Sequence, residues 1–114
     1  MKIAIVGSRN CGNPRLGDYI ESIIPLSDIE IIISGGARGI DSLAAEYANN
    51  HNIQLVEIKP DYQSYGKAAP IIRNKQIVDS ADMIIAFWDG ESRGTKSVID
   101  YSNKKSKNIK VFRI

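Results

Sequence analysis

The chain has 114 residues, of which 43% are hydrophobic and 25% are charged, and its formal net charge is +2. A chain of this length can build one domain around a hydrophobic core but not two, so residues 1–114 are expected to form a single domain. The small net charge gives no general reason to expect nucleic acid as a partner, and the lack of an apolar run near 18 residues argues against a membrane-spanning helix.

The N-terminal half of the sequence predicts three strands that alternate with two helices. Lys2 to Val6 is a short apolar strand, and the isoleucine-rich run from Ile29 to Ile33 is typical of a strand buried on both faces. Apolar residues from Leu16 to Ile24 recur at i, i+3, i+4, i+7 and i+8, which predicts a helix that the following proline ends. The same spacing from Ile40 to Ala48 predicts the second helix, and Ile53 to Ile58 alternates as the third strand.

The C-terminal half predicts a long loop followed by two helices and two strands. The loop, Lys59 to Ala69, is the longest in the chain, and long loops in small domains are often functional. A proline then suits the first turn of a helix over Pro70 to about Ser80, and Asp82 to Phe87 is the fourth strand. A last helix turns Val98, Ile99 and Ser102 inward before the fifth strand, at residues 109–114.

Five strands that alternate with four helices predict an α/β fold, because every connection is a β-α-β unit. Such connections are right-handed and give a parallel sheet with helices on both faces. We therefore expect a small doubly wound, Rossmann-like domain. The strand order 3-2-1-4-5 is favoured over 2-1-3-4-5, although periodicity alone does not decide between them.

The segment from Ile29 to Asp41 predicts an anion site. Its buried strand gives way at once to Gly35, Gly36 and Gly39, which allow a tight turn and leave backbone N–H groups uncovered. A helix begins directly afterwards, and its N-terminus carries about half a unit of positive charge. The alternative interpretation is a glycine-rich turn that serves packing alone.

Three loops rich in glycine, hydroxyl groups and arginine follow strands 1, 2 and 4: Gly7–Arg9, Ser34–Asp41 and Trp88–Thr95. In an open parallel sheet these loops meet at one edge, where strand order reverses and ligands bind. The loop after strand 3 adds Tyr62 and its neighbours. Three glycine-rich loops that the sheet must bring together are stronger evidence for a site than any one of them.

Each candidate side chain in these loops has a structural alternative to ligand binding. Ser8 and Thr95 either donate to a phosphate or cap helices. Asp41 either binds a ribose hydroxyl or stabilises a helix N-terminus. Trp88 either stacks on a base or packs at a strand end. The arginines could clamp phosphates through their planar fork of donors or remain solvated at the surface: these are Arg9, Arg38, Arg73 and Arg93.

Cysteine and histidine usage limits the chemistry further. Cys11 is the only cysteine, which excludes an internal disulfide and fits a reducing compartment, so a cytoplasmic location is expected. One cysteine and one histidine, His51, cannot build a Cys/His zinc site within one chain. We expect no metal and no required cofactor.

The motifs G-S-R, S-G-G-A-R-G-I-D, Y-G-K-A-A-x-x-x-R-N, A-D-M-I-I-A-F-W-D-G and S-R-G-T together resemble the SLOG superfamily, and do so over nearly the whole chain. This Rossmann-like group holds DNA-processing protein A and the LOG phosphoribohydrolases. The most similar branch is the small stand-alone proteins related to YpsA. The resemblance implies a pocket for a nucleotide or nucleotide-derived ligand, and it implies that homodimers can form.

The sequence departs from the hydrolases of this group at one position. Their motif P-G-G-x-G-T-x-x-E ends in a catalytic glutamate, whereas Gly94 and Thr95 here are followed by Val98 at the glutamate position. Asp100 is no simple substitute, because two residues along a helix correspond to about 200° around its axis. Arg73 does match the functional arginine that precedes the motif in this group.

We therefore hypothesise a protein that binds a nucleotide or nucleotide-derived small molecule, as a sensor or a sequestering module. The alternative is a nucleotide hydrolase with Asp89 or Glu91 as the base, and the third possibility is single-stranded DNA binding. Nucleic acid is disfavoured because the charge is small and no long basic stripe carries aromatics. The expected ligand-binding residues are Gly7, Ser8, Arg9, Ser34, Gly35, Gly36, Ala37, Arg38, Gly39, Asp41, Tyr62, Arg73, Asn74, Trp88, Gly94 and Thr95.

Overall fold

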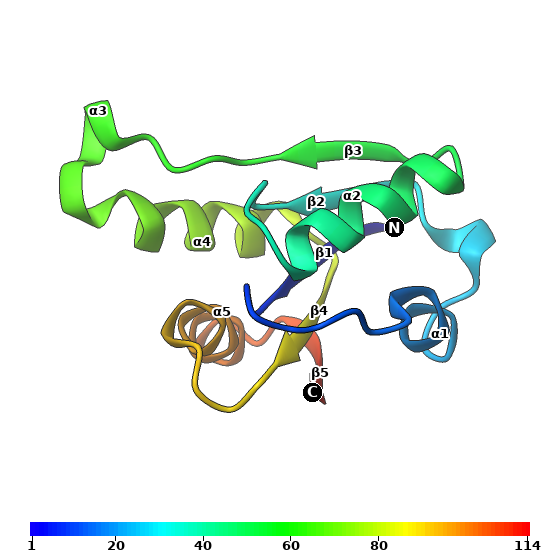
Figure 1. Cartoon of the computed structure of the whole chain (residues 1–114). Helices are drawn as coiled ribbons and strands as arrows, with labels where there is room; N and C mark the ends of the chain where they lie inside the picture. Colours follow the sequence, from blue (N-terminus) through cyan, green and yellow to red (C-terminus); the bar gives the residue numbers. More distant parts are fainter.

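The sheet has the parallel, doubly wound arrangement that the sequence predicts. The computed structural model of the chain describes all residues from 1 to 114. Its five strands are β1 (Lys2–Gly7), β2 (Ile31–Ser34), β3 (Gln54–Glu57), β4 (Met83–Trp88) and β5 (Asn108–Arg113). All neighbouring strands pair in parallel, in the order β3-β2-β1-β4-β5 (Figure 1). This confirms the favoured strand order.

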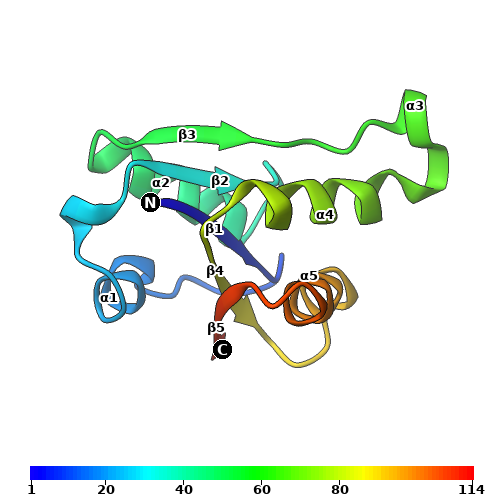
Figure 2. The ribbon, with the colours of Figure 1, turned by 180° about the vertical axis from the view of Figure 1, so that it is seen from behind.

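Helices cover both faces of the sheet. They are α1 (Leu16–Glu21), α2 (Ile40–Asn50), α3 (Tyr62–Tyr65), α4 (Ala69–Ser80) and α5 (Arg93–Lys104), with short 3₁₀ turns η1 (Leu26–Asp28) and η2 (Gly66–Ala68). Helices α1 and α2 lie on one face, and α4 and α5 lie side by side on the other (Figures 1 and 2). None of the helices has the length and apolar composition needed to span a membrane.

The central strand β1 divides the core into two halves, because successive side chains of a strand point to opposite faces. Ile3 and Ile5 belong to the cluster beneath α1 and α2, and both are fully buried. Ala4 and Val6 belong to the cluster beneath α4 and α5. Burial on both faces explains why the strands read as continuous apolar runs.

The structure corrects two of the predicted elements, whereas strand bounds differ from the predictions by only one or two residues. Helix α1 ends at Glu21, short of Ile24, because the Ser22 hydroxyl donates to the Tyr19 carbonyl at 2.6 Å and the chain tightens. The predicted loop at residues 59–69 contains α3 and η2. Asp61 caps α3, since its carboxylate accepts the Ser64 N–H at 3.1 Å.

Candidate functional site

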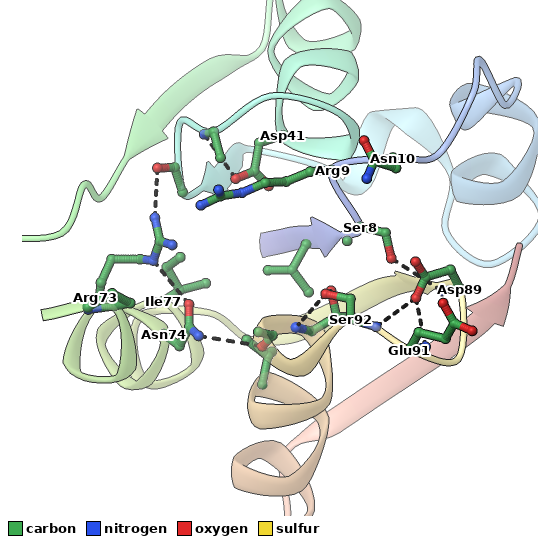
Figure 3. A pocket seen from close by; sticks show the side chains of 18 residues that line it. Ser8, Arg9, Asn10, Asp41, Arg73, Asn74, Ile77, Asp89, Glu91 and Ser92 are labelled. Carbon is green, nitrogen blue, oxygen red and sulfur yellow. Dashed lines mark hydrogen bonds between the residues drawn. The ribbon is translucent and has the colours of Figure 1, made fainter. Parts of the chain in front are cut away.

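A pocket of about 430 Å³ opens at the carboxyl end of β1, at the edge where strand order reverses. The segments that follow β1, β2 and β4 surround it together with α4, at the left, and α5, below (Figure 3). Of the predicted site residues, those that line the pocket are Gly7, Ser8, Arg9, Gly35, Ala37, Asp41, Arg73, Asn74, Asp89, Glu91, Gly94 and Thr95.

Arg73 reaches from α4 across to the loops after β2 and β3. Its Nη1 donates to the Gly35 carbonyl at 2.9 Å and to the Ile58 carbonyl at 3.4 Å, and its Nε donates to Asn74 Oδ1 at 3.0 Å (Figure 3). An arginine has five N–H donors, so the two on Nη2 remain free of protein partners. Burial lowers the Arg73 pKa from its usual value, while Asp41 opposes that shift. Arg73 thus ties loops together and keeps donors for a ligand.

Asp41, in the first turn of α2, is a buried carboxylate on the opposite wall from α5. One of its oxygens accepts the Ala37 N–H at 3.1 Å. Burial raises the pKa of the Asp41 carboxyl above its ordinary value, against the lowering effects of the Ala37 N–H, Arg73 and Arg9; Glu57 adds to the rise. The side chain of Arg9 lies next to Asp41 in the close view (Figure 3).

Two N–H groups of the glycine loop after β2 already form hydrogen bonds within the protein. The Gly36 N–H points to Ser34 Oγ at 3.3 Å, and the Ala37 N–H is taken by Asp41. The predicted cradle of free N–H groups at this loop is therefore partly filled, with the Asp41 carboxylate in the place of an anion. Gly35 remains at the pocket wall, where its Cα faces the Arg73 guanidinium.

Gly39 joins this loop to the loop after β1 by a close backbone approach. A Cβ at Gly39 would lie 2.5 Å from the Arg9 carbonyl oxygen and 2.6 Å from that of Ser8. The Ile40 N–H donates to the Ser8 carbonyl at 3.2 Å, so β1 caps the start of α2. One first-turn N–H of α2 is thereby bonded within the protein.

The N-terminus of α5 faces the pocket with donors to spare. Ser92 is its N-cap and accepts the Thr95 N–H, and the hydroxyls of Ser92 and Thr95 are 3.1 Å apart. The N–H groups of Arg93 and Gly94 lie in the first turn, where no helical carbonyl can reach them, and they have no other partner. This helix end therefore presents free N–H donors to the pocket, an arrangement that suits an anion.

Asp89 shapes the loop between β4 and α5. Its Oδ1 accepts the N–H groups of Glu91 and Ser92, each at 2.8 Å, and its own N–H donates to Ser8 Oγ at 3.2 Å. These bonds favour the ionised form, and they lower the Asp89 pKa below its ordinary value, the Ser92 N–H most. A carboxylate held in this way is a weak proton acceptor, which fits a structural role better than that of a general base.

The floor of the pocket is apolar. Val6, Ile77 and Val98 line it, and all three belong to the buried cluster beneath α4 and α5. Val98 occupies the position at which the LOG motif carries its glutamate, and its side chain is 2% exposed. The pocket thus offers a hydrophobic floor where the hydrolases place their acid–base group.

Six predicted binding residues do not line the pocket. Trp88 turns its indole N–H to the Ser92 carbonyl at 3.0 Å and lies beneath the Arg113 guanidinium, so it supports the loop rather than covering a base. Tyr62 is 61% exposed on α3, outside the pocket lining. The other four that lie outside the lining are Ser34, Gly36, Arg38 and Gly39. Arg93, which was considered as a phosphate clamp, also lies outside it.

Sequence reasoning missed several residues of the lining. Ser92 carried a signal, because serine directly before the start of a helix is a preferred N-cap residue. Asn10 followed directly after the G-S-R motif. The apolar members carried none, since apolar residues in a strand or helix predict core: these are Val6, Pro70, Ile77 and Val98.

The fold is shared with DNA processing protein A. The chain superposes on that protein from Streptococcus pneumoniae with a TM-score of 0.75 at 20% identity, covering 96% of this chain and 49% of that one. For the Helicobacter pylori protein, a structure described for its single-stranded DNA binding mode, the TM-score is 0.73 at 21% identity, with 97% and 64% covered. At such identities the likeness is one of fold.

Sequence relatives place the chain in a family. Over 80 residues it is 31% identical to the Gene 61 protein of Mycobacterium phage D29, covering 65% of this chain and 64% of that protein. The chain therefore spans less than two thirds of the length of each of these relatives. Residues 1–65, more than half of the chain, match the model of a SLOG family. The chain belongs to the YspA, cpYpsA-related SLOG family.

Proposed function

We propose that the pocket binds a nucleotide or a nucleotide-derived small molecule through its phosphate. The observation that carries the proposal is a pair of unused donor groups in one cavity: the Nη2 group of Arg73 and the first-turn N–H groups of α5. A guanidinium and a helix N-terminus are both suited to phosphate oxygens. The rest of the lining combines polar walls with an apolar floor, which fits a ligand that carries polar groups and one apolar face.

The size of the cavity supports a small molecule as the occupant. Small-molecule sites commonly enclose about 300–1,000 Å³, and the pocket of about 430 Å³ falls in that range. The apolar floor of Val6, Ile77 and Val98 offers a surface for a base or for a sugar face. Trp88 and Tyr62 lie outside the lining, so we assign the contact with a base to this apolar floor.

The direct test is a thermal-shift screen of the protein against nucleotides, ADP-ribose derivatives and cyclic dinucleotides. A ligand present at 100 times its dissociation constant stabilises the native state by about 2.7 kcal/mol, which raises the melting temperature by several degrees. Mass spectrometry then identifies what is recovered. An intact ligand supports binding, whereas base and ribose phosphate would establish hydrolysis. No shift with any compound overturns the proposal.

Gly94→Ala separates the role of the α5 N-terminus from the stability of the fold. A Cβ at Gly94 meets no atom within 4 Å, and alanine is a better helix former, so unfolding should become harder by about 0.4–1 kcal/mol. The added methyl group stands beside the free N–H groups. We expect ligand affinity to fall about 10-fold or more by titration calorimetry, and unchanged affinity would place the phosphate elsewhere.

Single-stranded DNA is a second candidate, because the Helicobacter pylori protein of the same fold is described for that binding mode. DNA binding neutralises several phosphates, so log K for a single strand falls with log salt with a slope of about −0.7 per phosphate contact. A mononucleotide makes few such contacts. Binding of an oligonucleotide that weakens steeply between 50 and 200 mM salt would favour this candidate over the mononucleotide.

A further inference from the structure

Asp41 is the one buried charged residue of the pocket lining. Its side chain is only 8% exposed, and one carboxylate oxygen accepts a single N–H, that of Ala37. The other oxygen has no hydrogen-bond partner. The side-chain polar atoms that lack both a partner and any exposed surface are the hydroxyls of Tyr47 and Ser102. The second Asp41 oxygen is not one of them, so it retains surface that is accessible to solvent. Because Asp41 lines the pocket, that accessible oxygen is an acceptor offered to a ligand.

The charges around Asp41 do not neutralise it by contact. Arg73 on α4 and Arg9 after β1 both favour its ionised form, but neither brings a nitrogen within 4.0 Å of the carboxylate. Glu57 at the end of β3 opposes ionisation. A buried carboxylate with one hydrogen bond and no ion pair costs the fold stability, which a purely structural helix-start residue would not do.

We propose that Asp41 is the selectivity residue of the pocket: its carboxylate accepts a hydrogen bond from a hydroxyl or N–H group of the ligand. This inference rests on the proposed function. The carboxylate repels phosphate oxygens, so the ligand should bind with its phosphate nearer the N-terminus of α5 than Asp41. A hydroxyl donor would be a free sugar hydroxyl, which an internal nucleotide of a DNA strand lacks.

The test compares the four ribonucleoside 5′-monophosphates with their 2′-deoxy and 2′,3′-dideoxy forms, on the full chain and on Asp41→Asn. Asparagine keeps an oxygen for the Ala37 N–H and presents an NH₂ donor to the pocket instead of an acceptor. In the unmodified chain, loss of the recognised hydroxyl should cost about 10- to 100-fold in affinity. Asp41→Asn should reduce the preference for ribo over deoxy forms, mainly by weakening the ribo forms, because the bond to an ionised acceptor is lost.

The affinities of the different nucleotides show whether the group that donates to Asp41 belongs to the sugar or to the base. A loss on removing sugar hydroxyls with all four bases identifies the sugar, and a loss on Asp41→Asn that depends on the base identifies a base N–H. Equal binding of every nucleotide by the unmodified chain and by Asp41→Asn overturns the inference while leaving the proposed function in place. If no nucleotide binds either protein, both fail.

The melting temperature distinguishes the proposed role of Asp41 from a structural one, because the two roles predict opposite shifts on substitution. A carboxyl whose pKa is raised by folding destabilises the native state above that pKa, and this penalty disappears below the unfolded value near 3.8. At pH 7 Asp41→Asn should therefore raise the melting temperature while it lowers affinity. Asp18→Asn, a change at an exposed residue outside the pocket, should leave affinity unaltered and shift the melting temperature only slightly, because its ion pair with Arg15 is solvent-exposed. A lower melting temperature for Asp41→Asn would mark a structural role and overturn the inference.

Discussion

Replacing Gly39 with alanine should destabilise the protein by about 3 kcal/mol or more, the largest single effect expected at the site. Gly39 has φ 77° and ψ −128°, a backbone conformation that costs a residue with a Cβ about 1–3 kcal/mol. The new methyl group would also stand 2.5–2.6 Å from backbone atoms of Ser8 and Arg9, which cannot move without breaking the contact between β1 and α2. Urea denaturation measures the loss directly.

Gly12→Ala is the matched control for this effect. Gly12 also has a positive φ, 67°, but a Cβ there meets no atom within 4 Å. Its substitution should cost only the backbone strain, about 1 kcal/mol. Equal losses for Gly12→Ala and Gly39→Ala would mean that the close approach of the two loops contributes nothing.

Arg73→Ala should produce the largest effect on ligand affinity, a loss of at least about 100-fold. The variant removes the charged donors of Nη2 from the pocket, and hydrogen bonds to charged groups contribute about 1.5–3 kcal/mol each. It also removes the bond to the Gly35 carbonyl, so stability should fall by about 1–3 kcal/mol. Calorimetry at saturating protein concentration and urea denaturation measure the two losses separately.

Two further variants separate charge from geometry at this position. Arg73→Lys keeps the positive charge but lacks the planar fork that directs one N–H to Gly35 and others to a ligand, so it should recover only part of the affinity. Arg38→Ala removes an arginine that lies outside the lining and should leave affinity within about twofold. A comparable loss for Arg38→Ala would show that the net charge, and not the placed guanidinium, attracts the ligand.

The sequence was sufficient to predict the architecture, because the fold depends on signals that are local and redundant. Four isoleucines followed by a glycine loop predict strand β2, and a proline near its start predicts α4. The sheet topology then places the three glycine-rich loops at one edge, and the structure has a pocket there. Helix α1 was predicted too long because Ser22 competes for a backbone carbonyl, an effect that apolar spacing does not register.

The inner detail of the site lay beyond the sequence because it depends on which partner each polar group finds. The glycine loop reads as an open anion cradle, yet Asp41 takes one of its N–H groups from four residues away. Trp88 reads as a candidate for stacking on a base, yet the Ser92 carbonyl and the Arg113 guanidinium occupy it. In each case a polar group could bond to a local or to a distant partner with similar strength. The amino-acid sequence does not show which of these hydrogen bonds forms.

The contacts that join the loops around the pocket have a consequence for how a ligand would bind. Ser8 holds both the start of α2 and the β4 loop, Asn74 reaches the Gly94 carbonyl, and Arg73 holds Gly35, so each wall is tied to its neighbour in the free protein. Walls that are already ordered give up little conformational entropy when a ligand enters. Association should then proceed without a slow closing step, and the free and bound backbones should differ by less than about 1 Å.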